Sequence, residues 1–371
     1  MNKDPKVSNI QIRGLIVSTV IGVGVLSLPN TLTMTMGNKG WVTIILAGIL
    51  IIPILYIINY IFKINPGKDF FQIGEETFGK IIFKIILIIM MAYFIDFCAY
   101  VVRSLGELVE AFLLPTTPIE VIVLSFILAT SYLATHEIDV ITRGGYFLYP
   151  IILLFAGIVI LISIPEADFS NLLPLNNIDY SQIPRGLLDS FVSFAGFEMI
   201  LFALPYVENG KDSTFKSSVY AMAMITAIYV LTYVVCIAHF SVEQLGRQLF
   251  PVLQLVKQVD LPGFFLENLD GLIMALWVLV VASTFIPAYF AAGKVISKIF
   301  NLKSHKYIIL ILIPIIYFLA LYPRDILQIN KILLKPFNIL GLMTGVILPL
   351  LFLIVILIKK KGKKGRRHYC S

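Results

Sequence analysis

Two glycines interrupt the first apolar segment of the chain, which spans about residues 10–36. The segment reads IQIRGLIVSTVIGVGVLSLPNTLTMTM, and Gly22-Val23-Gly24 lies near its middle. Glycine is about 1 kcal/mol worse than alanine in a helix, so two of them around one valine favour a break. Backbone that leaves the helix at membrane depth must line a cavity or be buried in protein. The N–H groups that begin the second half-helix would bind an anion such as a carboxylate. The alternative is a small-residue packing face.

A second apolar segment, at about residues 185–207, has a similar interruption. It reads RGLLDSFVSFAGFEMILFALPYV, with the break expected at Ser193-Phe194-Ala195-Gly196-Phe197. Carbonyl groups released there would accept hydrogen bonds from an ammonium group. Glu198 follows directly, and its carboxylate would bind that ammonium, carry a coupling proton, or brace the N–H groups of the broken helix. The two breaks together predict a zwitterion site formed by Gly22, Val23, Gly24, Phe194, Ala195, Gly196, Phe197 and Glu198, with Tyr100 and Thr284 at its side-chain end.

Five polar residues of the third apolar segment share one helical face. At 100° per residue they lie within about 80° of one another; they are Asp96, Tyr100, Arg103, Glu107 and Glu110. A charge inside a membrane costs at least ~2.5 kcal/mol and normally faces the bundle interior, paired with another. The stripe is therefore either structural, with Arg103 paired with Glu107 or lying between Asp96 and Glu110, or a polar path for ions, protons or water, formed by Asp96, Arg103, Glu107 and Glu110.

No residue pattern points to an enzyme. The chain has no nucleophile–base pair at useful spacing and no phosphate-binding glycine loop. Its three cysteines and four histidines form no ligand cluster, so no metal and no cofactor are predicted. The formal charge of +7 would suit nucleic acid, but the basic residues are scattered over short loops and the tail.

The composition places the chain in a membrane. Of its 371 residues 58% are hydrophobic and only 14% charged, and the mean hydropathy is +0.92. We expect one all-α membrane domain over residues 1–371. Its ten predicted spans are about 10–36, 41–62, 81–112, 119–135, 146–164, 185–207, 214–240, 269–298, 307–322 and 337–358, followed by a basic tail at 359–371.

The loop charges predict the orientation. With the N-terminus inside, 21 of the 29 lysines and arginines lie in the inside loops and ends, and seven lie outside. This bias predicts that both termini are cytoplasmic. Two loops are expected to form short helices: residues 65–79 inside, at the membrane interface, and residues 242–263 outside.

The two interrupted segments hold matching places in two halves that run in opposite directions. Broken helices at corresponding positions are typical of inverted-repeat transporters, with substrate near the bilayer midplane. We therefore expect a LeuT-like 5+5 inverted repeat with helices 1 and 6 broken. The first repeat would span about 10–164 and the second about 185–322.

Three strings carry a family resemblance over essentially the whole chain. IGVGVLSLP, LLPTTPIEVI and SFAGFEMILFALPYVENG resemble motifs of the B subunits of bacterial spore germinant receptors, in the amino acid/polyamine/organocation transporter superfamily. That family usually has Gly-x-Glu followed four positions later by Arg in the inside loop between spans four and five. This chain instead has Glu137-Ile138-Asp139 and Arg143, which puts an ion-pair role there in doubt.

The resemblance implies a permease-like subunit of the inner spore membrane that recognises a small nutrient, often an amino acid. Its partners would be an A-type membrane subunit and a C-type lipoprotein. In the superfamily the eighth span packs against the first break, where hydroxyls such as those of Ser283 and Thr284 can hold Na⁺; from the residues alone these hydroxyls would be packing groups. An ion- or proton-coupled amino acid transporter and a ligand-gated ion or water conduit are the alternatives, and the sequence leaves the nutrient open.

Overall fold

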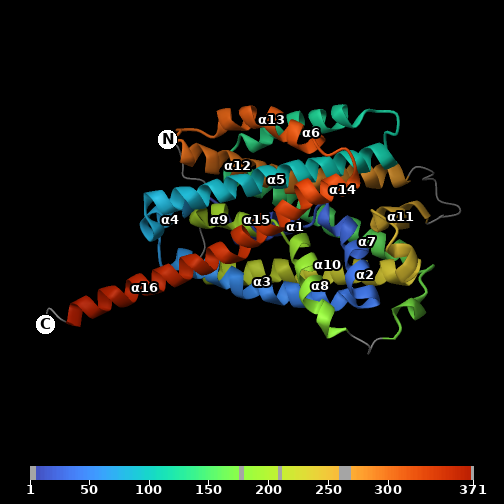
Figure 1. Cartoon of the computed structure of the whole chain (residues 1–371), viewed down its shortest axis with the longest axis horizontal. Coiled ribbons are helices and arrows are strands. Elements are labelled where there is room, and N and C mark those ends of the chain that lie inside the picture. The colour runs from blue at the N-terminus through green and yellow to red at the C-terminus, as the bar shows by residue number, and fades with distance from the viewer. Residues whose placement is uncertain (1–5, 175–178, 208–210, 259–268, 369–371) are drawn as a thin grey trace.

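Helices make up the protein. The computed structural model describes residues 6–174, 179–207, 211–258 and 269–368 (Figure 1). Within these residues the only β-type pairing is a parallel bridge between Val7 and Val207. Outside the two interrupted segments and the last span, the helices are α3 (Gly40–Lys63), α4 (Phe70–Phe78), α5 (Lys80–Phe112), α6 (Ile119–Ala134), α7 (Ile138–Ser163), α10 (Lys211–Leu245), α11 (Pro251–Gln258), α12 (Leu269–Ile299) and α13 (Lys306–Leu321). Helix α10 is kinked at Ser241, where φ is +61°.

The first apolar segment is broken where the glycines predict it. Helix α1 (Asn9–Val20) begins with a capping box, in which Ser8 accepts a hydrogen bond from the Gln11 N–H and the Gln11 side chain accepts one from the Ser8 N–H. The chain leaves the helix at Ile21 and resumes as α2 (Gly24–Met36). No side chain caps α2, so its first N–H groups have no partner of that kind.

The second break also lies at its predicted residues. Helix α8 (Ile183–Ser193) ends there, and the chain continues as η4 (Phe197–Met199), α9 (Ile200–Ala203) and η5 (Leu204–Tyr206), bent by 50° from α8. Gly196 adopts φ +113°, a left-handed conformation that favours glycine. A Cβ added there would lie 2.7 Å from the Thr19 carbonyl oxygen, so the two breaks touch directly.

The two broken segments cross the bundle in opposite directions. Helix α1 packs against η4 and α9, the second half of the other segment, whereas α2 packs against α8, its first half. This antiparallel pairing of breaks is the arrangement expected for a LeuT-like helical membrane protein. The exact boundaries of the two repeats stay a prediction.

Six helical segments of the described chain are long and apolar enough to cross a membrane, or seven if the bent pair from Tyr180 to Tyr206 counts as one. Two shorter apolar helices, α6 and α13, and the half-helix α1 fall below that length. The predicted count of ten spans therefore stays a prediction.

Two span boundaries differ from those expected. Helix α7 begins at Ile138, eight residues before the predicted start, because Gly144-Gly145 continues the helix. A Cβ at Gly145 would lie 2.7 Å from Ser18 Oγ and one at Gly14 would lie 2.6 Å from the Tyr146 backbone, so these glycines allow α1 and α7 to cross closely.

The last span is longer than predicted. Helical structure runs from Ile326 to His368 through α14 (Ile326–Ile329), α15 (Lys335–Leu342) and α16 (Leu348–His368). Two π-helical turns, Asn330–Leu334 and Met343–Ile347, connect them. Figure 1 shows α16 extending beyond the rest of the bundle.

The two loop helices lie at opposite ends of the bundle (Figure 1). Helix α4 buries Phe70 and Ile73 against the protein, and α11 likewise buries Val252 and Leu253. Both predicted helices are thus confirmed, although α4 packs on the bundle as well as carrying exposed polar residues. Residues 259–263, the last part of the predicted outer loop, lie outside the described residues.

Candidate functional site

A cavity of about 90 Å³ lies between the two breaks. Its wall combines the end of α1, the start of α2, the end of α8, the middle of α5, and α12 and α15. On one side the rings of Tyr100 and Phe337 stack with centroids 5.4 Å apart, and Phe97 contacts Phe337 at 5.0 Å. By the space that one water needs, the volume admits on the order of six to nine non-hydrogen atoms.

Six of the predicted ligand-binding residues line this cavity: Gly22, Val23, Gly24, Tyr100, Ala195 and Thr284. The other five lie behind its wall and are buried: Phe194, Phe197 and Glu198 on the second broken segment, with Gly196 between them, and Ser283 on α12. The sequence thus identified the two breaks correctly, and the structure brings them together around one space.

Tyr229 on α10 joins the breaks, and the sequence analysis missed it. Its hydroxyl oxygen lies 2.9 Å from the Val20 carbonyl oxygen at the end of α1 and 2.9 Å from the Ser193 carbonyl oxygen at the end of α8. A phenol has one proton, so the two carbonyls share one donor. The residue is fully buried. Tyr229 lies in an apolar stretch of the sequence. A tyrosine buried there needs a polar partner for its hydroxyl, and this need was the one signal that could have identified it.

Ser283 and Thr284 fasten α12 to α1 just before the first break. Both hydroxyls donate to the Ser18 carbonyl oxygen, at 3.0 and 3.1 Å, and Ser283 also lies 2.7 Å from the Val280 oxygen. The two hydroxyl oxygens and the Ser18 carbonyl oxygen therefore converge, a ligand set that suits a hard cation. A Na⁺ ion here would replace these hydrogen bonds as the link between the helices, and it stays a prediction.

Glu198 braces the second break. Its two carboxylate oxygens accept from the Gly196 N–H at 3.1 and 2.9 Å, and Oε1 also accepts from the Tyr93 hydroxyl at 2.6 Å. The side chain is buried and does not line the cavity. Of the three roles that the sequence left open for Glu198, these contacts fit the structural one, in which the carboxylate braces the broken helix.

The polar stripe of α5 divides between two surroundings. Tyr100 lines the cavity with Phe97 and Val101, which lie at about 100° and 140° from Asp96 around the helix. Arg103 does not line the cavity; its guanidinium lies 3.5 Å from the Ala320 carbonyl oxygen of α13. Within the described chain, none of the four residues predicted as an ion or water path lines the cavity, so that path stays a prediction.

Arg103 and Glu107 form the ion pair that the stripe predicts. Glu107 Oε1 accepts from Arg103 Nη2 at 2.6 Å and from Nε at 3.0 Å. The Arg103 side chain is 8% exposed and that of Glu107 33%. Asp96, in contrast, has a buried carboxylate oxygen with no hydrogen-bond partner.

We expect Arg103→Gln and Glu107→Gln each to lower the thermal stability of the purified protein, by roughly 1–3 kcal/mol. This is below the 3–5 kcal/mol of a fully buried pair because Glu107 is partly exposed. In the double variant no charge is left unpaired, so its midpoint should lie above that of the Arg103 single variant. Additive losses in thermal unfolding would contradict a coupled pair.

At the N-terminal end of α1, away from the cavity, polar contacts join the chain to residues 206–214. The Val7 N–H donates to the Tyr206 carbonyl oxygen at 2.9 Å. Asn9 donates to Ser213 Oγ at 2.7 Å and accepts from Thr214 at 2.8 Å. The cavity instead extends along α2 and α8, through Ser27, Thr31 and Asp189. The cavity thus extends away from these contacts, on the side of α2 and α8, called the hollow side below; a separate cavity of about 200 Å³ lies at the end that carries the contacts, beside Phe70, Tyr206 and Lys294.

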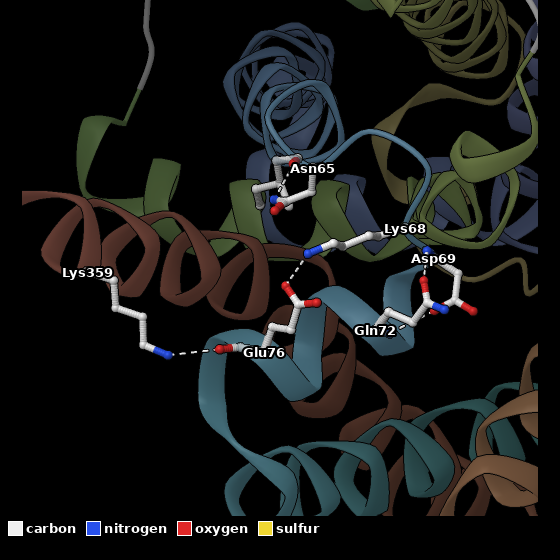
Figure 2. A network of polar contacts seen from close by, with 7 residues as sticks. Asn65, Lys68, Asp69, Gln72, Glu76 and Lys359 are labelled. Atoms are coloured by element: carbon white, nitrogen blue, oxygen red, sulfur yellow. Dashed lines mark hydrogen bonds and ion pairs between the residues drawn. The ribbon is translucent and has the colours of Figure 1, made fainter. Parts of the chain in front are cut away.

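Helix α4 is held by polar contacts (Figure 2). Asp69 and Gln72 form a capping box, and Lys68 pairs with Glu76 at 2.5 Å. Lys359 of α16 donates to the Glu76 carbonyl oxygen at 2.9 Å (Figure 2). The last span is therefore tied to this helix.

The structure also shows the contacts of the residues that depart from the family pattern between predicted spans four and five. Arg143 pairs with Asp139 at 2.6 Å on α7, while Glu137 pairs with Lys294 of α12 at 2.7 Å. Burial and the nearby Lys294 ammonium lower the pKa of His305, whose ring lies 3.9 Å from Glu137. This loop thus forms ion pairs although its charged residues differ in position from those of the family pattern.

In the described part of the chain, no three His, Cys, Asp or Glu side chains are grouped as a metal site would need.

Sequence comparison finds relatives across nearly the whole chain. The family model described as "Spore germination protein" matches residues 6–329. Spore germination protein A2 of Bacillus subtilis (strain 168) is 30% identical over 326 residues, covering 87% of this chain and 88% of that protein. Spore germination protein YndE of the same organism is 26% identical over 360 residues, covering 97% and 98%. GerQB of Bacillus cereus is 26% identical over 327 residues, covering 88% and 89%.

Solved structures with the same arrangement are transporters. The crystal structure of MhsT in complex with L-phenylalanine matches with a TM-score of 0.68 at 14% identity, covering 96% of this chain and 99% of that chain. A Na⁺-coupled sialic acid symporter, in a substrate-bound outward-open state, matches with a TM-score of 0.74 at 13% identity, covering 96% and 80%. At such identities the likeness shows the fold alone, which is LeuT-like. Because the family model spans most of the chain, this protein belongs to the spore germination protein family of membrane permeases and is a transport or receptor protein, not an enzyme.

Proposed function

We propose that this chain is the nutrient-binding, permease-like subunit of a spore germinant receptor. The nutrient is a small amino acid-like zwitterion that binds in the cavity between the two helix breaks. Its carboxylate accepts hydrogen bonds from the N–H groups at Gly22-Val23-Gly24, and its ammonium lies toward the end of α8. Tyr100 and Thr284 line the same cavity, with Thr284 beside Gly22.

The cavity between the facing breaks is the observation that carries this proposal. Both breaks line it, and α2 begins there without a side-chain cap, which leaves N–H donors for a carboxylate. The room for about six to nine non-hydrogen atoms suits a small amino acid. The named relatives are spore germination proteins, and one structural neighbour holds an amino acid.

Binding would act on a closed–open equilibrium. Polar contacts hold the end that carries Val7 and Asn9, and the loop charges suggest that this end faces the spore core, with both termini on that side. A nutrient that enters from the hollow side shifts the equilibrium only if it binds the two states with different affinity. The shift would be passed to an A-type membrane subunit and a C-type lipoprotein in the inner spore membrane.

The proposal is tested by separating signalling from uptake. Spores that lack this chain should lose their response to one amino acid, and a plasmid copy should restore it. Vesicles that contain the purified chain should bind that radiolabelled amino acid without accumulating it against a gradient of Na⁺ or protons. Accumulation driven by an ion gradient would instead favour a coupled transporter. An unchanged germination response without the chain would contradict a receptor role.

A further inference from the structure

The hollow side of the cavity carries two hydrogen-bond acceptors that have no donor. Asp189 on α8 and Asn338 on α15 both line the cavity. Asp189 Oδ2 and Asn338 Oδ1 are shielded from solvent, yet neither has a hydrogen-bond partner. A buried acceptor without a partner destabilises the folded protein by about 1–3 kcal/mol. Two such acceptors on one cavity therefore suggest that a ligand supplies the donor. The sequence analysis assigned no role to either residue.

Hydroxyl groups on α2 add to the same character. Ser27 and Thr31 line this part of the cavity, one and two turns beyond Gly24. Their hydroxyls donate to backbone carbonyls, Ser27 to Gly24 at 3.5 Å and Thr31 to Ser27 at 3.2 Å. With its proton used in this way, the Thr31 oxygen presents lone pairs to the cavity, whereas the Ser27 hydroxyl also interacts with that of Tyr100. The hollow side is therefore rich in acceptors, whereas the first break presents N–H donors.

The charges agree with this polarity. Asp189 is the one charged side chain among the residues that line the cavity, all of which are described. Arg185, one turn earlier on α8, is exposed and acts on Asp189 at a distance, and Thr35 also interacts with the Asp189 carboxylate. A carboxylate on the wall of a small, partly dehydrated space favours a cation far more than it would in water.

We propose that Asp189 and Asn338 form an outer subsite for a protonated amine at the far end of the germinant. This rests on the proposed function, because it takes the carboxylate end of the ligand to lie at Gly22-Val23-Gly24. Asp189 precedes Ser193 by one helical turn, and Ser193 touches Gly24, so the subsite lies about one turn beyond the break. The ligand class is thus a short amino acid with a second amino group on its side chain.

Two probes of equal size separate charge from volume. L-2,4-diaminobutyrate and L-norvaline have the same number of non-hydrogen atoms, and only the former ends in an ammonium group. Dissociation constants of both are measured with the full-length chain in lipid nanodiscs at pH 6.5. We expect the wild-type chain to bind the diamine at least about tenfold more tightly. Asp189→Asn should lower that preference by about ten- to a hundredfold, since it removes a charged hydrogen-bond acceptor.

A second substitution at the subsite tests it in the opposite direction. Asn338→Asp adds a carboxylate at the same end and should increase the preference for the diamine, which keeps the test valid if Asp189→Asn fails to fold. Glu243→Gln removes an exposed carboxylate outside the cavity and should leave the preference unchanged.

The outcomes separate the two proposals. If wild type binds neither probe, the ligand site of the proposed function is overturned and the subsite with it. If both probes bind equally, or Asp189→Asn and Asn338→Asp leave their ratio unchanged, only the outer subsite is overturned. A diamine preference that falls with the first variant and rises with the second supports the subsite.

Discussion

Spores that carry Gly24→Leu are expected to show no germination at any nutrient concentration, although the protein reaches the membrane in normal amount. The substitution adds four carbon atoms at the start of α2, where the cavity admits on the order of six to nine non-hydrogen atoms. A Cβ at Gly24 already lies 3.3 Å from Ser193 Cα, so the longer side chain must enter the cavity or separate α2 from α8. Either result removes the space for a ligand.

Smaller and remote substitutions distinguish loss of the site from loss of the fold. Gly24→Ala adds only that Cβ and should raise the nutrient concentration needed for half-maximal response by a few-fold. Gly157→Leu makes the same glycine-to-leucine change on α7, where an added Cβ has no neighbour within 4 Å, and should respond as wild type. The measurement is germination against nutrient concentration, with immunoblots of the membrane fraction. A normal response curve in well-expressed Gly24→Leu spores would place the ligand elsewhere.

The sequence was sufficient to locate both helix breaks because glycine acts locally. Gly22 and Gly24 weaken one helix, and Gly196 allows a positive φ in the other. Whether the two breaks meet depends on tertiary structure. In the sequence, only their matching positions in the two halves indicated that they would. The structure confirms the meeting through the close contact of Gly196 with Thr19.

The residues that complete the site could not be predicted in the same way. Tyr229, Asp189 and Asn338 line the cavity or join its walls only because three separate helices present them at the right rotation. Helical period gives the relative directions of residues within one helix, but not which direction faces a neighbour. The stripe of α5 illustrates this limit: its face was predicted correctly, yet Arg103 faces α13 while Tyr100 faces the cavity.

Span boundaries were missed for a related reason. The predicted fifth span began at residue 146, directly after the Gly144-Gly145 pair. In the structure Gly145 sits against Ser18, where any side chain would force α7 and α1 apart. The same residue type thus breaks one helix and permits the close crossing of two others. Only the packing partner distinguishes the two cases, and a single sequence does not show it.

Glu198→Ala is expected to destabilise the protein by roughly 2–5 kcal/mol, enough to lower its amount in the membrane. The carboxylate is the acceptor for the Gly196 N–H and for the Tyr93 hydroxyl, and both groups would be left buried without a partner. Each unpaired group costs about 1–3 kcal/mol. Glu198→Gln should lose less, because its amide oxygen still accepts from Gly196.

A double-variant cycle with Tyr93→Phe makes this argument quantitative. Tyr93→Phe removes the hydroxyl donor, so adding it to Glu198→Ala should cost little or even recover stability, whereas two independent sites would give additive losses. Glu166→Ala, an exposed glutamate outside the bundle core, is the matched control and should keep the wild-type midpoint. Thermal unfolding of the detergent-purified wild type and of each of these variants is the measurement. If Glu198→Gln unfolds like wild type but its spores ignore every nutrient, the carboxylate serves the ligand or a coupling proton instead of the helix break.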